Sequence, residues 1–141
     1  AQACVAEGAS VMLADVLADE GAAAARALGP AAAFVDCDVA HRDEIAAAVA
    51  ATVAAFGGLD GLVNNAGIAP RGRIDDVSPA DFDRVIATNL TAAFHAIQLA
   101  LPHLSAGSAI VNMSSVNGRL TIPDLLAYNV AKGGLDQLTR N

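Results

Sequence analysis

The sequence predicts an α/β domain built on a parallel β-sheet that carries helices on both faces. Short apolar runs alternate along the chain with longer helical patterns, and this alternation is typical of βαβ units. Polar residues directly follow the expected strands, as they do where parallel strands end at a ligand-binding edge. With 141 residues the chain is expected to be one domain.

Four strands and five helices are expected. The strands are expected at residues 10–14, 31–35, 59–63 and 108–113. The helices are expected at residues 1–8, 19–28, 42–56, 79–101 and from 126 onward. Ser78-Pro79-Ala80-Asp81 predicts a helix start, because serine caps a helix, proline suits its first position and an acid favours its first turn. Gly8 and Gly57 predict helix ends.

The charge and hydropathy of the chain exclude two kinds of partner. Eight Lys and Arg stand against 15 Asp and Glu, which gives a formal net charge of −7. The scattered basic residues form no stripe for phosphate backbones or anionic lipids, so we expect neither nucleic acid nor a membrane as a partner. The longest apolar stretch, residues 85–104, includes Asn89, His95, Gln98 and His103, which argues against a membrane-spanning helix.

The two cysteines, Cys4 and Cys37, lie in separate expected elements and lack a C-x-x-C spacing. We interpret both as free, non-catalytic thiols of a cytoplasmic protein. The three histidines form no cluster with them that has the spacing of metal ligands, so no metal site is expected. The first residues lack the pattern of a signal peptide.

Tyr128 and Lys132 are the most chemically suggestive pair. They lie four positions apart in the last expected helix, so both side chains share one face. An unperturbed phenol titrates near ~10, and a nearby ammonium favours the phenolate, which suits a tyrosine for proton transfer at neutral pH. In isolation such a pair is also common as an ordinary helix contact.

Ser115 strengthens the catalytic interpretation of that pair. Ser114-Ser115 follows the expected strand at 108–113, at the sheet edge where α/β proteins hold ligands. The hydroxyl of Ser115 could hydrogen-bond a substrate carbonyl; the alternative is a turn formed by two serines. No G-x-S-x-G pattern is present, so a nucleophilic serine hydrolase is not indicated.

Other polar residues follow strands or interrupt apolar helices. Asn64-Asn65-Ala66-Gly67 ends the third expected strand, where small and amide residues allow close approach to a flat ligand. Asn89 lies in an apolar helix, which is costly unless its amide or a freed backbone carbonyl is used. Asp15 and Asp38 follow the first two strands, where carboxylates can receive a nucleotide's ribose; solvated surface positions are the alternative.

Taken together, these residues resemble the classical short-chain dehydrogenase/reductase family. The resemblance covers essentially the whole chain and rests on the order and spacing of one set of motifs. The set is Asp15, Asp38-Val39, Asn64-Asn65-Ala66-Gly67, Asn89, Ser115 and Tyr128-Asn129-Val130-Ala131-Lys132. The resemblance implies a Rossmann-type doubly wound parallel sheet, NAD(P)(H), and reversible oxidation of an alcohol to a ketone or aldehyde.

The resemblance also implies four catalytic residues. Tyr128 would be the general acid/base that protonates the carbonyl oxygen as hydride arrives. Lys132 would promote the phenolate and hold the ribose hydroxyls beside the nicotinamide. Ser115 would orient and polarise the carbonyl, and Asn89 would position Lys132 through a water relay.

The implied cofactor contacts lie at the strand ends and on the last helix. They are Asp15, Asp38, Val39, Asn65, Ala66, Gly67, Tyr128 and Lys132. Asp38 and Val39 would form the adenine pocket, and Asp15 would receive the adenosine ribose. NAD is expected in preference to NADP, because the carboxylate of Asp15 repels a 2′-phosphate and the next residue, Val16, is not basic.

The family pattern extends beyond both ends of this chain. Its members begin with a strand and a T-G-x-x-x-G-x-G turn, and they end with further strands and a substrate lid. We therefore expect residues 1–141 to form a single partial domain. The first strand would lie between those at 10–14 and 59–63, so its loss would leave a gap of roughly 9 to 10 Å.

Three functions are compatible with these observations. The favoured one is a dehydrogenase acting on a small-molecule alcohol or carbonyl compound, assembled as a homodimer or homotetramer through the helices of Asn89 and Tyr128. A non-catalytic binding relative is the second, although all four catalytic positions are present. The third is an inactive fragment, since the 141 residues alone are expected to aggregate and to bind no NAD.

Overall fold

The computed structural model describes residues 1–141 and has the expected alternation of helices and strands. The strands are β1 (Val11–Asp15), β2 (Ala32–Asp36), β3 (Gly61–Asn64) and β4 (Ala109–Asn112). The helices are α1 (Gln2–Ala6), α2 (Ala18–Leu28), α3 (Arg42–Phe56), α4 (Pro79–Ile86), α5 (Ala92–Ala100) and α6 (Leu126–Arg140). Three short elements join them: η1 (Ala87–Thr91), η2 (Leu101–His103) and η3 (Val116–Gly118). The predicted α/β class is therefore confirmed.

The strands form two separate pairs, and both pairs are parallel. β1 pairs with β2 from Val11↔Ala32 onward, and β3 pairs with β4 from Gly61↔Ala109 onward. No ladder joins β1 to β3, so the sheet is interrupted where the sequence predicts the missing strand. Each of these two strands keeps one edge on which backbone N–H and C=O groups have no strand partner.

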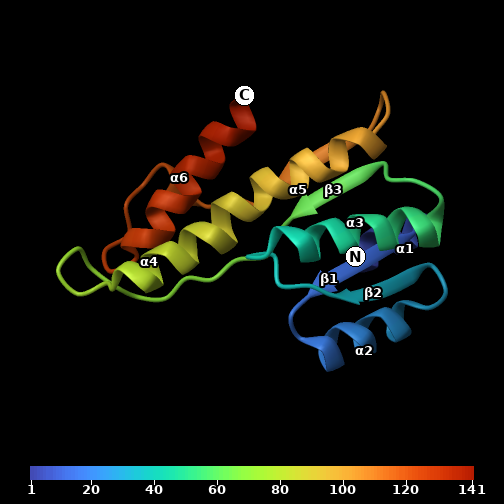
Figure 1. The fold of residues 1–141 in the computed structure, drawn as a ribbon, viewed down its shortest axis with the longest axis horizontal. Coiled ribbons are helices and arrows are strands. Elements are labelled where there is room, and N and C mark those ends of the chain that lie inside the picture. Colours follow the sequence, from blue (N-terminus) through green and yellow to red (C-terminus); the bar gives the residue numbers. More distant parts are fainter.

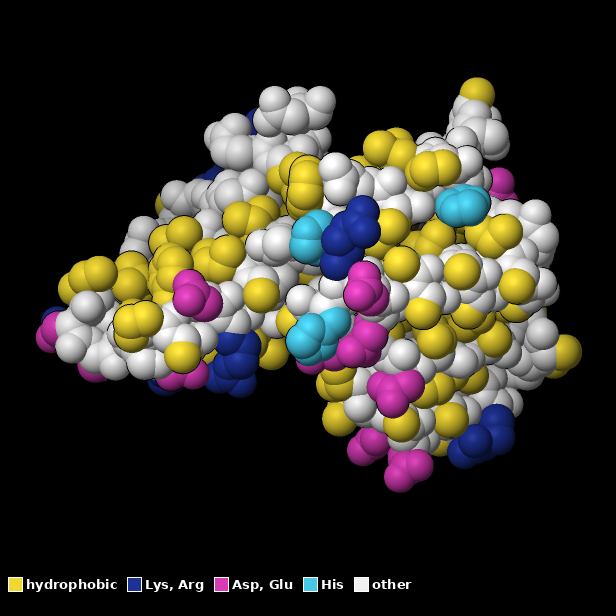
Figure 2. Space-filling view, in the orientation of Figure 1, with side chains coloured by type: hydrophobic (Ala, Val, Ile, Leu, Met, Phe, Trp, Pro, Cys, Tyr) yellow, Lys and Arg dark blue, Asp and Glu magenta, His cyan; other side chains and the backbone are white.

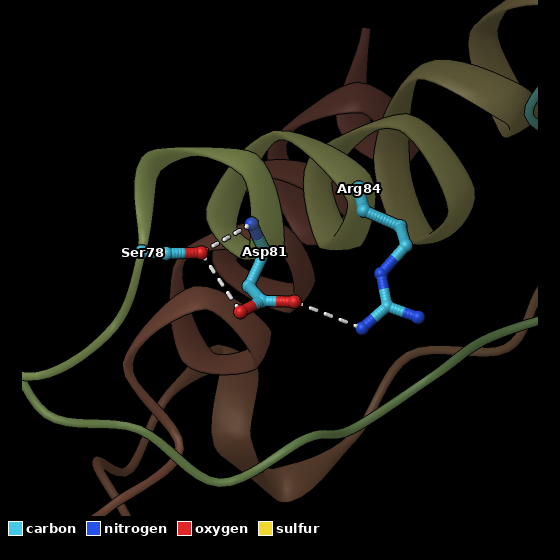
Figure 3. Close-up of polar contacts among 3 residues, drawn as sticks. All are labelled: Ser78, Asp81 and Arg84. Atoms are coloured by element: carbon cyan, nitrogen blue, oxygen red, sulfur yellow. Dashed lines mark hydrogen bonds and ion pairs between the residues drawn. The ribbon is translucent and has the colours of Figure 1, made fainter.

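The predicted helix start at Ser78 is present in detail (Figure 3). The Ser78 hydroxyl accepts a hydrogen bond from the Asp81 N–H at 3.0 Å and donates one to the Asp81 carboxylate at 2.8 Å. Arg84 donates to the other carboxylate oxygen at 3.0 Å. These hydrogen bonds, that from Ser78 first, lower the pKa of Asp81. The cap therefore fixes where α4 begins.

The expected helix over 79–101 is one rod with a widened turn. α4 and α5 are joined by η1, a π-helix that contains Asn89, and the rod runs diagonally across the molecule (Figure 1). Pro79–His103 is long and apolar enough to cross a membrane, by length and composition only, and a core helix passes the same test. Six of the sixteen buried residues lie on the rod: Val85, Asn89, Ala92, Ala93, Ala96 and Ala100. It packs against α3 and α6, which indicates a core helix.

The core is built largely from alanine. In one cluster Cys37, which follows β2, and Ile45 of α3 pack against Ala92 and Ala96 of α5. A second joins Val85 of α4 to two alanines of α6. Alanine buries little area but lets helices approach closely. This close approach brings α6 beside α4 at one end of the rod and α3 beside α5 at the other, while α2 covers β1 and β2 below them (Figure 1).

Acidic side chains gather around the first turns of α2 and α3 (Figure 2). There their negative charges interact favourably with the positive end of each helix dipole. Both cysteines are free: Cys4 is exposed and Cys37 is buried. Burial raises the pKa of the Cys37 thiol, and Glu44, Asp38 and Asp36 raise it further. Thiolate chemistry is therefore disfavoured at Cys37.

Candidate active site

The strands of each pair end side by side, so their polar terminal residues are juxtaposed. Asp15 lies opposite Asp36, and Asn64 lies opposite Asn112. The Asn64 amide donates to the Asn112 side chain at 2.8 Å across the β3–β4 pair. Asn112 in turn donates to the Thr139 hydroxyl of α6 at 3.0 Å. A chain of polar contacts therefore ties the end of β3 to β4 and to α6.

Lys132 is the central cation of the site. It is 4% exposed, and its Nζ donates to the backbone carbonyl of Met113, the residue after β4, at 2.5 Å. Burial lowers the pKa of this lysine. Its Nζ lies 5.5 Å from the centroid of the Tyr128 ring, within the range of a cation–π contact. The predicted proximity of Tyr128 and Lys132 is thus seen in the structure.

Ser115 follows β4 and directly precedes η3, which packs against α6. It caps η3, and its Oγ accepts a hydrogen bond from the Asn117 N–H at 3.2 Å. The neighbouring Ser114 donates to the Lys132 carbonyl at 3.4 Å. An open cavity of about 530 Å³ begins at these serines and is lined by Ser114, Ser115, Val116, Arg119, Leu120 and Asp136. Ser115 thus borders a cavity large enough for a small molecule.

Asn89 contacts the segment after β3. Its Oδ1 accepts from the Ile68 N–H and its Nδ2 donates to the Ile68 carbonyl, both at 2.8 Å. Both polar atoms of the buried amide therefore have a hydrogen-bond partner, which offsets the cost of burying an asparagine in an apolar helix. A Cβ on Gly67 would lie 3.4 Å from Asn89 Oδ1, which is an ordinary contact, so the segment after β3 packs directly on the Asn89 amide. No hydrogen bond joins the Asn89 side chain to Lys132.

The remaining sequence-predicted residues lie at two strand edges. Asp15 is exposed, and its Oδ1 accepts from the Leu17 N–H at 3.1 Å. Asp38 and Val39 follow β2 and are half-buried, and Asn65, Ala66 and Gly67 follow β3 and are exposed. Solvent can therefore reach the carboxylate of Asp15 and the residues that follow β3. The structure divides the predicted cofactor contacts between the two strand pairs.

Three groups contribute to the site although the sequence assigned them no role. They are the Met113 carbonyl that receives Lys132, the amide of Asn117, and the amide of Asn129, which the sequence placed only in the motif around Tyr128. The adjacency of Asn129 to Tyr128 and the position of Asn117 two residues after Ser115 are the signals that could have indicated the amides. Every residue type has a backbone carbonyl, so the role of the Met113 carbonyl could not be predicted from the sequence.

Comparison with known proteins agrees with this architecture. A family model described as Enoyl-(Acyl carrier protein) reductase matches residues 1–141. The chain is similar to a solved structure from Brucella melitensis, described as short-chain dehydrogenase/reductase SDR:Glucose/ribitol dehydrogenase. The TM-score is 0.95 at 31% identity, over 99% of this chain and 60% of that one. The fold is therefore that of a Rossmann-type α/β domain.

Two curated relatives give the same result. The trans-4-hydroxycyclohexanecarboxylate dehydrogenase of Sinomonas cyclohexanicum is 39% identical over 99% of this chain and 58% of its own length. The inactive 2-(S)-hydroxypropyl-CoM dehydrogenase 2 of Xanthobacter autotrophicus is 42% identical over 99% of this chain and 62% of its own. The chain spans somewhat more than half the length of these relatives. It belongs to the short-chain dehydrogenase/reductase family.

Proposed function

We propose that the full-length protein is an NAD-dependent oxidoreductase that interconverts a small-molecule alcohol and its ketone or aldehyde. The observation that carries this proposal is the environment of Lys132. Its amine is buried beside Tyr128 and forms no ion pair with an acidic residue. Burying an unpaired cation is costly, so such a group at a ligand-binding edge is typical of catalysis rather than of stability.

In this proposal Tyr128 transfers the proton and its neighbours adjust its environment. During reduction the phenol gives its proton to the substrate carbonyl oxygen, and during oxidation the phenolate takes it back. The Lys132 ammonium stabilises the phenolate by its charge. Ser115 hydrogen-bonds the same substrate oxygen from the border of the cavity. Asn89 acts on Lys132 through water.

The cofactor would be held by residues of both strand pairs, and when bound it supplies or accepts the hydride. An ammonium has three N–H donors, and Met113 uses one of those on Lys132. The other two remain for ribose hydroxyls. Asp15 would receive the adenosine ribose, and its charge favours NAD over NADP. Asp38 and Val39 would line the adenine pocket, and Asn65, Ala66 and Gly67 would contact the cofactor at the end of β3.

A homodimer or homotetramer in the cytoplasm completes the proposal. Apolar side chains remain exposed on the helical rod and on α6, among them Phe94 at 45%, Leu101 at 55% and Val130 at 47%. Patches of hydrophobic side chains are also visible along the rod in Figure 2. A second copy would remove this surface from water.

The test is Tyr128→Phe in the full-length protein, assayed with a panel of alcohols and ketones. We expect turnover to be lost while NADH binding, measured by fluorescence titration, changes less than about twofold, since the phenol oxygen moves the proton and contributes little to cofactor affinity. Lys132→Met is expected to reduce both turnover and binding, because one ammonium serves both. Turnover near the wild-type rate in Tyr128→Phe would contradict the catalytic assignment.

A non-catalytic binding protein is the second candidate, and one observation favours it: a relative with 42% identity is described as inactive. The two candidates differ in one measurement. A non-catalytic protein would bind NADH but oxidise no member of the alcohol panel, and Tyr128→Phe would then change nothing.

A further inference from the structure

Asn117 is the one buried amide near the site to which the proposed mechanism gives no task. It is 7% exposed and lies in η3, between Ser115 and the first turn of α6. Its Oδ1 receives the Ser115 hydroxyl at 3.1 Å, and its Nδ2 donates to the Asn129 Oδ1 at 2.7 Å. The Asn129 Nδ2 continues the chain to the Ile122 carbonyl at 2.9 Å. Four groups are thus joined in series.

The direction of every hydrogen bond in this series follows from its last member. A backbone carbonyl only accepts, so Asn129 must present its NH₂ group to Ile122. Its oxygen then faces Asn117, which must present its own NH₂ group to Asn129. The remaining Asn117 oxygen faces Ser115, and the serine hydroxyl is therefore the donor. No other assignment of the two amides satisfies all three contacts.

Asn117 therefore holds the Ser115 hydroxyl at two points. Its backbone N–H donates to Oγ at 3.2 Å, and its side-chain oxygen accepts the hydroxyl proton at 3.1 Å. A free serine side chain samples three rotamers about χ1, but two contacts from one buried residue fix Oγ in one of them. When a substrate oxygen arrives, the proton can turn to it by rotation about the Cβ–Oγ bond while the backbone contact still holds Oγ.

We propose that Asn117 is a positioning residue for Ser115, and that its amide direction is set through Asn129 by the Ile122 carbonyl. This inference rests on the proposed function, because it requires Ser115 to contact the substrate. The rate of the chemical step falls steeply when a group that contacts the substrate is misplaced. Asn129 lies next to Tyr128 in the sequence, so the same series also couples the serine loop to the helix that carries the tyrosine.

The test is a double-mutant cycle in the full-length protein, with variants Ser115→Ala, Asn117→Ala and the double variant. We expect Asn117→Ala to lower kcat about tenfold, or about 1.4 kcal/mol, the net worth of one hydrogen bond, with KM changed less than twofold. In the Ser115→Ala background the same change should have no further effect on kcat, because its target is gone. Melting temperatures of all variants are measured alongside.

The outcomes separate the inference from the proposed function. Full additivity of the two changes in kcat would overturn the positioning role, since it would mean that Asn117 acts without Ser115. A Ser115→Ala variant with wild-type kcat would instead overturn the role of Ser115 in the proposed function. If Asn117→Ala fails to fold, Asn117→Asp keeps an oxygen toward Ser115. Its kcat relative to wild type should rise as pH falls and the carboxyl becomes protonated, which restores a donor toward Asn129; a flat ratio would overturn the inference.

Discussion

Gly118→Ala should destabilise the full-length protein and displace Ser115, because no room exists for a Cβ between η3 and α6. A Cβ built on Gly118 would lie 2.9 Å from the Lys132 carbonyl oxygen and 2.8 Å from the Asp136 carboxylate. Asp136 can rotate, at the expense of its pairing with Arg119 at 3.7 Å. The carbonyl oxygen belongs to the α6 backbone and cannot move independently.

The size of the effect follows from the missing distance. Ordinary contact begins at 3.4 Å, so η3 and α6 must separate by about 0.5 Å, the difference between 3.4 and 2.9 Å. Overpacking of this kind costs about 1–3 kcal/mol, and we expect about 2 kcal/mol for Gly118→Ala. Because Ser115 lies three residues before Gly118, the same displacement should also lower kcat.

Gly133→Ala is the matched control, since Gly133 faces the same contact from α6. Its Cβ would lie 3.6 Å from the Gly118 carbonyl, which is an ordinary contact. Alanine in a helix interior is favoured over glycine by about 0.5–1 kcal/mol, so this variant should be slightly more stable than wild type. Urea unfolding gives both free energies. The reasoning is wrong if Gly118→Ala is as stable as wild type, or if both variants lose stability equally.

Three further results are expected. Asp15→Ala should raise kcat/KM for NADPH relative to NADH roughly 10- to 30-fold, because about 1.5–2 kcal/mol of repulsion of a 2′-phosphate is removed; an unchanged ratio in steady-state assays would contradict this. Asn89→Leu should lower the free energy of unfolding in urea by about 2 kcal/mol, because the Ile68 N–H and C=O lose their partners; a change below about 0.5 kcal/mol would count against it. A maleimide at pH 8 should label Cys4 but leave Cys37 unlabelled until urea is added, since a raised pKa keeps Cys37 protonated; equal labelling in the folded protein would refute this.

The local features of the fold could be predicted from the sequence, because they depend on residues close together in the chain. The Ser78 cap, the left-handed Gly57 at φ +81° and the shared helix face of Tyr128 and Lys132 are of this kind. Asn89 combines a feature that the sequence predicts with one that it does not. Its burial cost could be predicted, but the widening of the helix around it depends on how α4, α5 and α6 pack together.

The supporting contacts of the candidate site could not be predicted, since loops bring them together. Asn117 and Asn129 are 12 residues apart, and the loop between them has no periodicity that would predict their contact. Lys132 meets Met113 across 19 residues through a backbone carbonyl that every residue type possesses. Spacing motifs identify which side chains can do chemistry, whereas the groups that orient them depend on the tertiary fold.

The two parallel strand pairs have unequal consequences for how the chain folds. β1 and β2 pair across 21 residues, whereas β3 and β4 pair across 48. The entropy lost on closing a loop grows with its length, by about 0.7 kcal/mol between 21 and 48 residues, so the β1–α2–β2 unit is expected to form first. The β3–β4 pair spans the long helical rod and is expected to form later. Ser115 and Lys132 belong to that later half, so the residues of the candidate active site are expected to be among the last to reach their native positions.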